Sequence, residues 1–397
     1  MYQNVPYKRV FVTIDLDAIV FNMESMKQNI KPGTEMMGVV KADGYGHGAV
    51  PVAKAMDPYV WGYAAATSEE ALQLRAHGIT KPVLVLSPVH PSEFQELIRE
   101  GIRITVFTRE QAEDISKEAS ALGKTANIHI AVDTGMSRIG VIPDEHSAAL
   151  VEEISQMDGI RVEGLFTHFA KADEEEKEST RKQMERFTYF ARLLEDRGLE
   201  IPRKHVANSA GIIDFPEFSC DMVRAGITVY GMYPSDEVEK NRVPLRPAMS
   251  LNSYVTYVKT IEAGTEVSYG GIFKAEKPMR VATVCIGYAD GYPRSASNKG
   301  RVLIHGKSAR ILGRVCMDQL MVDVTDISEV QPWDLVTLIG RDGDDGITME
   351  ELAEASGGFH YELACIFGKR VPRVYVKGGK IVGTKDYFHD QYEDFLE

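Results

Sequence analysis

Cysteine, long apolar runs and positive charge are all scarce in this sequence of 397 residues. No stretch approaches the roughly 20 apolar residues that cross a bilayer. Lys and Arg number 45 against 58 Asp and Glu, for a formal net charge of −13, which argues against a nucleic-acid or anionic-membrane surface. The four cysteines are far apart and form no CxxC pair, so neither a disulfide framework nor a zinc site is expected at Cys220, Cys285, Cys316 and Cys365.

Composition and length favour an ordinary globular protein. Apolar residues make up 44% of the chain and charged residues 26%, the balance of a folded protein. The length predicts two or three domains, of which one can be a large barrel. The N-terminal segment lacks the apolar core of a signal peptide. We therefore expect a cytoplasmic protein that binds a small molecule and neither metal, nucleic acid nor membrane.

Short β-branched runs alternate with amphipathic helical patterns through roughly the first 230 residues. This alternation predicts a parallel sheet. Eight strands predict a closed (β/α)8 TIM barrel, with an open doubly wound sheet as the alternative. We expect the strands near Met37–Lys41, Gly62–Ala66, Val83–Leu86, Ile104–Phe107, Ile128–Val132, Val162–Thr167, His205–Ala207 and Met222–Ala225.

After about Pro247 the pattern changes to a period of two between Gly and Asp turns. That pattern predicts a mostly antiparallel β domain, interrupted by one helical stretch at 348–357. The early run VFVTIDLDA is assigned to the same domain. We thus expect the barrel over residues 15–246 and the β domain over 1–14 together with 247–397.

Reactive and polar side chains follow five of the predicted strands. In a (β/α)8 barrel the C-terminal ends of the strands carry the chemistry, so these side chains should converge on one rim. They are Lys41–Gly48 after the first strand, Asp133–Arg138 after the fifth, His168 after the sixth, Asn208 and Ser209 after the seventh, and Arg224, Gly226 and Ile227 at the eighth.

Two features of this rim suggest a cofactor. Ser209, Gly226 and Ile227 lie where barrels usually bind phosphate, and Gly226 has no Cβ to block an anion from the backbone. Lys41 ends the apolar run GVVK, and a half-buried lysine is a nucleophile that forms Schiff bases. Taken singly, the glycine and serine also fit simple turns, and the lysine fits a strand end pointing to solvent. Together they indicate pyridoxal 5′-phosphate (PLP).

The segment VVKADGYGHG at residues 39–48 resembles the PLP-lysine signature of alanine racemases. HVANSAG at 205–211, VRAGITVYG at 223–231, IGYADGYPR at 286–294 and GRVCMDQLMVD at 313–323 match the same family in order, and the resemblance covers essentially the whole chain. It implies a PLP-dependent isomerase that interconverts L- and D-alanine, supplies D-alanine for peptidoglycan, and works as a homodimer with composite active sites.

The resemblance also implies a role for each candidate residue. Lys41 would hold PLP as a Schiff base and exchange the α-proton of D-alanine, while Tyr288 of the partner subunit would serve L-alanine from the opposite face. The other implied contacts are the phosphate at Tyr45, Ser209, Gly226 and Ile227 with Asn208 beside it, the pyridine nitrogen at Arg224 supported by His168, and the cofactor O3′ and substrate carboxylate at Arg138 with Met317 of the partner subunit.

Elementary chemistry agrees with two of these assignments. Racemisation removes a proton from one face of Cα and returns one to the other, which two opposed bases do more easily than one. Arg224 stays protonated and can only donate hydrogen bonds, so it would leave the pyridine nitrogen unprotonated and limit side reactions such as transamination.

Two positions depart from the common family pattern. Ala131 stands where many members carry a carbamylated lysine that orients the arginine corresponding to Arg138, which leaves a bound anion or Asn127 to hold Arg138. Lys369 stands where a tyrosine often lines the pocket, so serine is an alternative substrate.

Three functions besides racemisation fit a barrel with a reactive lysine. They are a PLP-dependent decarboxylase, a non-catalytic PLP-binding protein and a Schiff-base aldolase without PLP. Arg224 argues against the decarboxylase, which would need a carboxylate at the pyridine nitrogen. The long β domain argues against the PLP-binding protein, and visible cofactor absorbance would exclude the aldolase.

Overall fold

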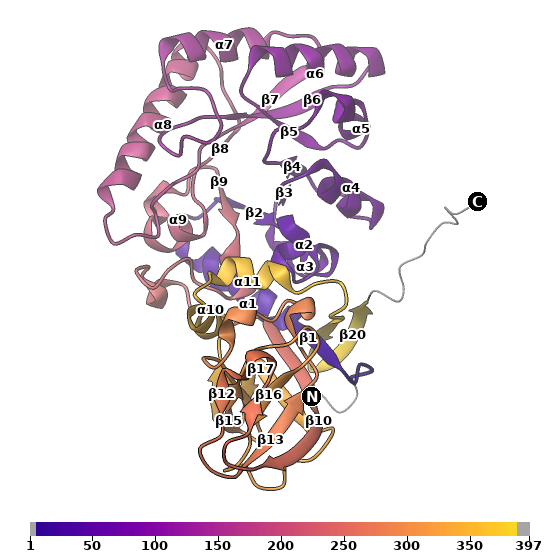
Figure 1. Cartoon of the computed structure of the whole chain (residues 1–397). Coiled ribbons are helices and arrows are strands. Elements are labelled where there is room, and N and C mark those ends of the chain that lie inside the picture. Colours follow the sequence, from indigo (N-terminus) through magenta and orange to yellow (C-terminus); the bar gives the residue numbers. More distant parts are fainter. Residues whose placement is uncertain (1–4, 387–397) are drawn as a thin grey trace, which may run out of the picture. The chain divides into compact units, whose positions relative to one another are not determined.

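The protein, described here by a computed structural model over residues 5–386, divides into two compact units (Figure 1). One, the barrel unit, comprises Ala18–Arg246. The other, the β unit, comprises Met1–Asp17 together with Pro247–Glu397.

The barrel unit contains a closed ring of parallel strands, in which the last strand pairs with the first. This confirms the predicted (β/α)8 barrel and excludes the open sheet. The strands in ring order are β2 (Glu35–Val39), β3 (Gly62–Ala65), β4 (Val83–Val85), β5 (Arg103–Val106), β6 (Ala126–Ala131), β7 (Ile160–Phe166), β8 (Arg203–His205) and β9 (Met222–Ala225).

Helices lie outside the ring of strands, as α4 to α8 do in Figure 1. Thr67, Thr108 and Asp144 cap three of them by accepting a hydrogen bond from a backbone N–H in the first turn. The helices are α1 (Leu16–Asn29), α3 (Ala49–Met56), α4 (Ser68–Ala76), α5 (Phe94–Arg99), α6 (Arg109–Leu122), α7 (Glu145–Ser155), α8 (Glu178–Asp196) and α9 (Ser209–Asp214). None of the helices between residues 5 and 386 is long and apolar enough to cross a membrane.

The first strand ends earlier than predicted. Lys41 begins a short turn element, α2 (Lys41–Tyr45), instead of ending a strand. Its residues Ala42, Asp43 and Tyr45 have φ values of 53°, 50° and 49°, a left-handed conformation that the alternation pattern could not reveal. Such local strain is typical of functional sites.

The β unit is built on one ten-stranded sheet, in the order β18-β17-β14-β15-β16-β13-β10-β1-β19-β20. β1 (Val10–Asp15) pairs antiparallel with β10 (Met249–Ile261) and parallel with β19 (Arg373–Lys377), so the early run belongs to this sheet as predicted. The other strands are β13 (Met279–Val284), β14 (Arg301–Ile304), β15 (Lys307–Leu312), β16 (Leu320–Asp323), β17 (Leu335–Asp342), β18 (Asp345–Ile347) and β20 (Lys380–Lys385), with a separate pair of β11 (Glu266–Val267) and β12 (Phe273–Lys274).

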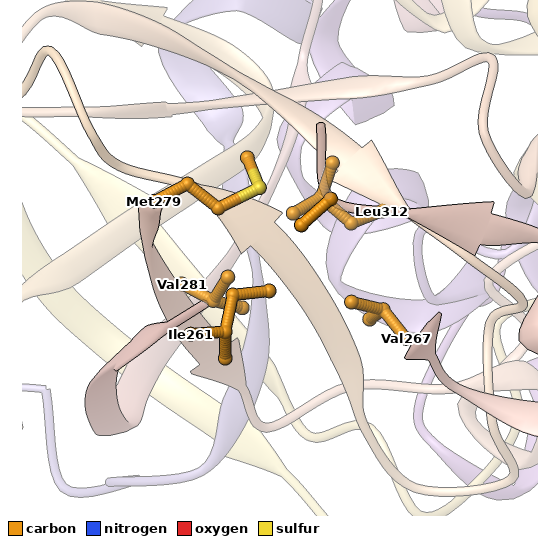
Figure 2. Close-up of a cluster of buried hydrophobic side chains, with 6 residues drawn as sticks. Ile261, Val267, Met279, Val281 and Leu312 are labelled. Atoms are coloured by element: carbon orange, nitrogen blue, oxygen red, sulfur yellow. The ribbon is translucent and has the colours of Figure 1, made fainter. Parts of the chain in front are cut away.

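Two helices interrupt the β unit where one was predicted. α10 (Met349–Ser356) fits the helical pattern at 348–357, and α11 (His360–Ile366) follows it. Part of the core of this unit is a cluster of buried aliphatic side chains, for each of which full burial contributes about 1.5–3 kcal/mol (Figure 2). Its members include Ile261, Val267, Met279, Val281 and Leu312.

Candidate functional site

The candidate site includes the buried guanidinium of Arg224. Arg224 is 3% exposed on β9. Nη1 donates to the carbonyl oxygen of His205 (2.8 Å) and to His205 Nδ1 (2.9 Å). Nη2 donates to the carbonyl oxygens of Thr167 (2.7 Å) and Val206 (3.0 Å) and to His168 Nδ1 (3.3 Å). All of these acceptors are uncharged, so the positive charge is held by dipoles.

The two histidines beside Arg224 are neutral. Burial lowers the pKa of His168 and of His205 well below the usual range, and the charge of Arg224 lowers both further. Because an arginine can only donate, Nδ1 of His205 must be the acceptor and its Nε2 carries the proton. His168 lies between two donors, Arg224 Nη2 at its Nδ1 (3.3 Å) and Asn208 Nδ2 at its Nε2 (3.5 Å). Burial, with the nearby charge of Arg138, also lowers the pKa of Arg224 to about 9, which leaves it protonated at neutral pH.

A cradle for an anion lies at the ends of β8 and β9. Ser209 Oγ accepts from the backbone N–H of Gly226 (3.1 Å) and lies 3.0 Å from Thr228 Oγ1. A Cβ on Gly226 would lie 3.2 Å from Ser209 Oγ and 3.5 Å from the Tyr45 hydroxyl, so any larger residue would fill the space between them. The 3-10 turn Ile227–Tyr230 starts directly after Gly226. Hydroxyls and backbone N–H groups around a gap are the donors that a phosphate requires.

Lys41 and Arg138 bring further positive charge to this rim. The Lys41 ammonium lies 6.0 Å from the centroid of the Tyr45 ring. Charge repulsion from Arg138 and Lys41 contributes to the lowered pKa of His168, which places both cations near that imidazole. Asp133 Oδ1 accepts from the backbone N–H groups of Gly135 and Ser137, both at 3.0 Å, and so shapes the turn that leads to Arg138.

Asn127 does not hold Arg138. It lies near the N-terminal end of β6, whereas Arg138 follows the C-terminal end. Ala131 is four residues further along the strand than Asn127, roughly 13 Å at the usual rise of a strand. That suggestion from the sequence was wrong, because it took no account of the end of the strand to which each residue belongs.

The β unit presents Tyr288 and Met317 side by side on two adjoining turns. The backbone N–H groups of Tyr288 and Ala289 donate to the carbonyl oxygens of Cys316 and Met317, both at 3.0 Å. A Cβ on Gly287 would lie 2.3 Å from both of these oxygens, so only glycine permits this approach. Tyr288 is 41% exposed and Met317 is 51% exposed.

A buried carboxylate fixes both turns. Asp290 is fully buried and accepts from the Gly287 N–H at 3.0 Å. Arg9 donates two hydrogen bonds to it, of 2.9 and 2.6 Å, and Arg370 Nε lies 3.1 Å from Oδ1. Arg370 also donates a hydrogen bond of 2.7 Å to Asp318, the residue directly after Met317. Lys369 is exposed and directly precedes Arg370 in the chain. It therefore lies in the same part of the β unit as these two turns.

The predicted site residues therefore fall into two groups. Lys41 and the predicted cofactor contacts belong to the barrel unit with Arg138, while Tyr288 and Met317 belong to the β unit. Within the barrel unit the structure brings together Tyr45, His168, Asn208, Ser209, Arg224, Gly226 and Ile227 through the contacts above and the hydrogen bond from Asn208 Nδ2 to the carbonyl oxygen of Phe169. In the part of the chain from 5 to 386, no group of three or more His, Cys, Asp or Glu side chains is arranged to hold a metal ion.

Comparison with known proteins identifies the family to which this arrangement belongs. The family model described as alanine racemase, N-terminal domain, matches residues 14–234, and the one described as alanine racemase, C-terminal domain, matches residues 248–375. The chain belongs to the alanine racemase family.

Relatives and solved structures of the alanine racemase family match nearly the whole chain. Curated alanine racemases from Methanococcus maripaludis and Clostridium tetani are 45% and 43% identical, over 92% and 95% of this chain and 98% of their own lengths. The structure of alanine racemase from Clostridium difficile 630 has a TM-score of 0.93 at 39% identity, covering 97% of this chain and 100% of that one. The Bacillus anthracis structure with bound L-Ala-P has a TM-score of 0.90 at 37% identity, covering 96% and 98%.

Sequence reasoning missed several groups that shape this racemase-family site. The pairing of Arg9 and Arg370 with Asp290 could not be recognised from the sequence, because the two arginines lie 281 and 80 positions from Asp290. Asp290 lies inside the matched segment IGYADGYPR, but only the fold reveals that it is the buried anchor. Thr228, whose hydroxyl joins the anion cradle, was similarly inside a matched segment without an assigned role.

The Asp290→Asn variant should lower the free energy of unfolding by about 2 kcal/mol, because charge-assisted hydrogen bonds to two arginines are lost. Asp318→Asn is the matched control. Its side chain is 55% exposed and pairs with only one of the two arginines, so it should cost less than about 1 kcal/mol. Urea titration of both variants measures the difference, and equal losses would contradict the anchoring role of Asp290.

Proposed function

We propose that this chain interconverts L- and D-alanine with PLP, as a homodimer in which Lys41 of one subunit and Tyr288 of the partner subunit act on opposite faces of the substrate. The observation that carries the proposal is the buried Arg224, held by uncharged groups beside an anion cradle on the rim of the barrel. A cationic donor at this place fits an unprotonated pyridine nitrogen.

The residues on the rim fit the cofactor. The gap beside Gly226 suits the phosphate, with Tyr45, Ser209 and the backbone N–H of Ile227 as donors and Asn208 next to them. Among residues 5–386, Nε of Arg224 donates to no protein acceptor, so it remains available for a ring nitrogen. Lys41 would hold the aldehyde carbon of PLP. When bound, PLP withdraws electrons from Cα of the amino acid and makes its proton acidic.

Side chains of the protein would then transfer the proton of Cα. Lys41 would carry it to and from one face of Cα, and Tyr288 of the partner subunit would do so at the other. A tyrosine ordinarily titrates near pH 10 and needs a cationic neighbourhood to act as a base at neutral pH. The rim supplies that neighbourhood through Lys41, Arg138 and Arg224. Arg138 would also pair with the substrate carboxylate, and Met317 of the partner subunit would line the pocket.

The dimer is supported by what the β unit exposes. Tyr288, Met317 and Tyr269 are 41%, 51% and 68% exposed, and the last two line one hollow with Ser268 and Cys316. Apolar side chains grouped in this way are typical of a surface that another subunit covers. We further propose that the barrel unit is the PLP-binding domain and that the enzyme supplies D-alanine for peptidoglycan in the cytoplasm.

Mixed dimers test the composite site. Lys41→Ala and Tyr288→Phe should each abolish the formation of D-alanine from L-alanine that the wild type shows. After the two variants exchange subunits, half of the dimers are mixed and each has one intact site, so about a quarter of wild-type activity should return. The control is Lys41→Ala mixed with the double variant, which should regain none. Absence of recovery, with exchange confirmed by mass spectrometry, would contradict the placement of Tyr288 across the dimer.

Substrate choice is proposed to depend on Lys369. This residue is exposed next to Arg370, which binds both turns of the β unit, so a change here alters the wall beside Tyr288 and Met317. The Lys369→Tyr variant should raise the ratio of alanine to serine racemisation by about threefold or more. Chiral chromatography of both reactions measures it. An unchanged ratio would mean that Lys369 does not select the substrate. The sequence would then give no reason to expect serine as an alternative substrate.

A further inference from the structure

A chain of buried polar side chains runs through the barrel interior from Arg224. Nε2 of His205 lies 2.9 Å from Nδ1 of His129, a residue of β6. His129 Nε2 lies 3.4 Å from Glu163 Oε2 on β7. Glu163 in turn accepts from Arg103 of β5 at 2.9 and 3.3 Å. The interior of such a barrel is ordinarily filled by branched apolar side chains, so this chain requires a reason.

The direction of every hydrogen bond in this chain follows from Arg224. Because Arg224 donates to His205 Nδ1, the proton of His205 is on Nε2 and is donated to His129 Nδ1. The proton of His129 is therefore also on Nε2 and points at Glu163, which accepts it. Burial lowers the pKa of His129, as it does for His205, so both rings stay neutral.

The carboxylate at the end of the chain is ionised. Burial alone would raise the pKa of Glu163, but the hydrogen bonds with His129 and Arg103 and the charge of Arg103 outweigh it and lower the pKa to about 2. Glu163 is 5% exposed. It is thus a permanent negative charge inside the barrel, connected through two oriented imidazoles to the buried positive charge of Arg224.

The backbone is shaped to make this contact. The register between β6 and β7 passes from Ile128 opposite Val162 to His129 opposite Gly164, so Glu163 is the extra residue of a bulge. Bulges re-aim side chains and are usually retained for that purpose. A Cβ on Gly164 would lie 2.2 Å from His129 Nδ1, so glycine is what leaves room for the ring.

We propose that the ionised Glu163, itself held by Arg103, acts on Arg224 only through the hydrogen bonds of His129 and His205, which makes all three positioning residues for this guanidinium. The proposal rests on the function proposed above. The charge of Glu163 holds the proton of each imidazole on Nε2, so Nδ1 of His205 always accepts from Arg224 and the guanidinium keeps one orientation, with Nε available to a cofactor ring. None of the three residues needs to touch the cofactor or the substrate.

Neutron diffraction from the deuterated protein tests the first half of the proposal without reference to activity. Deuterium should be found on Nε2 of His129 and His205 and be absent from both Nδ1 atoms. Deuterium on Nδ1 of either ring would overturn the proposal, because the chain would then not run from Arg224 to Glu163. This result is independent of whether the enzyme racemises alanine.

Glu163→Gln tests the second half in the PLP-loaded dimer, because it keeps an acceptor of the same shape and removes the charge. We expect kcat for alanine to fall about tenfold with KM within about twofold, since the affected group faces the cofactor and not the substrate. Titration of the cofactor-free protein with PLP should show a Kd raised by a similar factor.

Glu35→Gln is the matched control. Like Glu163, Glu35 lies on a barrel strand and pairs with an arginine, Arg203, at 3.2 Å, but it makes no hydrogen bond to the histidines. The kcat and the Kd of this variant should therefore stay within about twofold of wild type. Equal effects of the two variants, or an unchanged Kd and kcat in folded Glu163→Gln, would overturn the proposal.

If Glu163→Gln fails to fold, Glu163→Asp, which keeps the charge, should fold and retain the wild-type Kd more closely than His129→Gln does. The reverse order would also overturn it. A wild type that binds PLP and racemises nothing would instead reject the proposed function.

Discussion

A positive charge enclosed in the barrel is the constraint on which the rest of the site depends. Arg224 is almost fully buried and is held by backbone carbonyls and imidazoles, whereas a carboxylate neighbour would be the simplest way to stabilise it. This arrangement requires two neutral histidines beside Arg224, of which His205 accepts at Nδ1, and it leaves Nε of Arg224 without an acceptor among residues 5–386. A carboxylate in place of Arg224 would favour a protonated cofactor ring, the arrangement that suits decarboxylation better than racemisation.

The two units carry different kinds of surface. The barrel rim gathers cations and an anion cradle, shaped by the missing Cβ of Gly226 and by the left-handed turn after Lys41. The β unit offers an exposed tyrosine on a turn that is anchored by a buried carboxylate between two arginines. In the proposed mechanism Tyr288 acts as its anion, and a surface rich in cations would stabilise that anion.

Much of this could be predicted from the sequence, and the exceptions share a cause. Strand alternation predicts the barrel, and the rule that chemistry lies at the strand ends selects Lys41, His168, Ser209 and Arg224. The sequence does not predict contacts that depend on which way a strand residue points: Glu163 and His129 look like ordinary strand residues until the bulge in β7 turns them toward each other. Nor does it pair Arg9 with Asp290, because 281 positions separate them, or reveal α11, which is too short for a clear period.

In the proposed mechanism, two groups on opposite faces of Cα exchange protons with the substrate. The most direct test is to incubate the PLP-loaded protein with L-alanine in deuterated water, stop the reaction at a few per cent conversion, and measure the deuterium at Cα of each enantiomer after chiral separation. Two bases predict D-alanine that carries deuterium from solvent while the remaining L-alanine keeps its protium. D-alanine that retains the original protium would show one group carrying the proton between both faces, and would contradict the account.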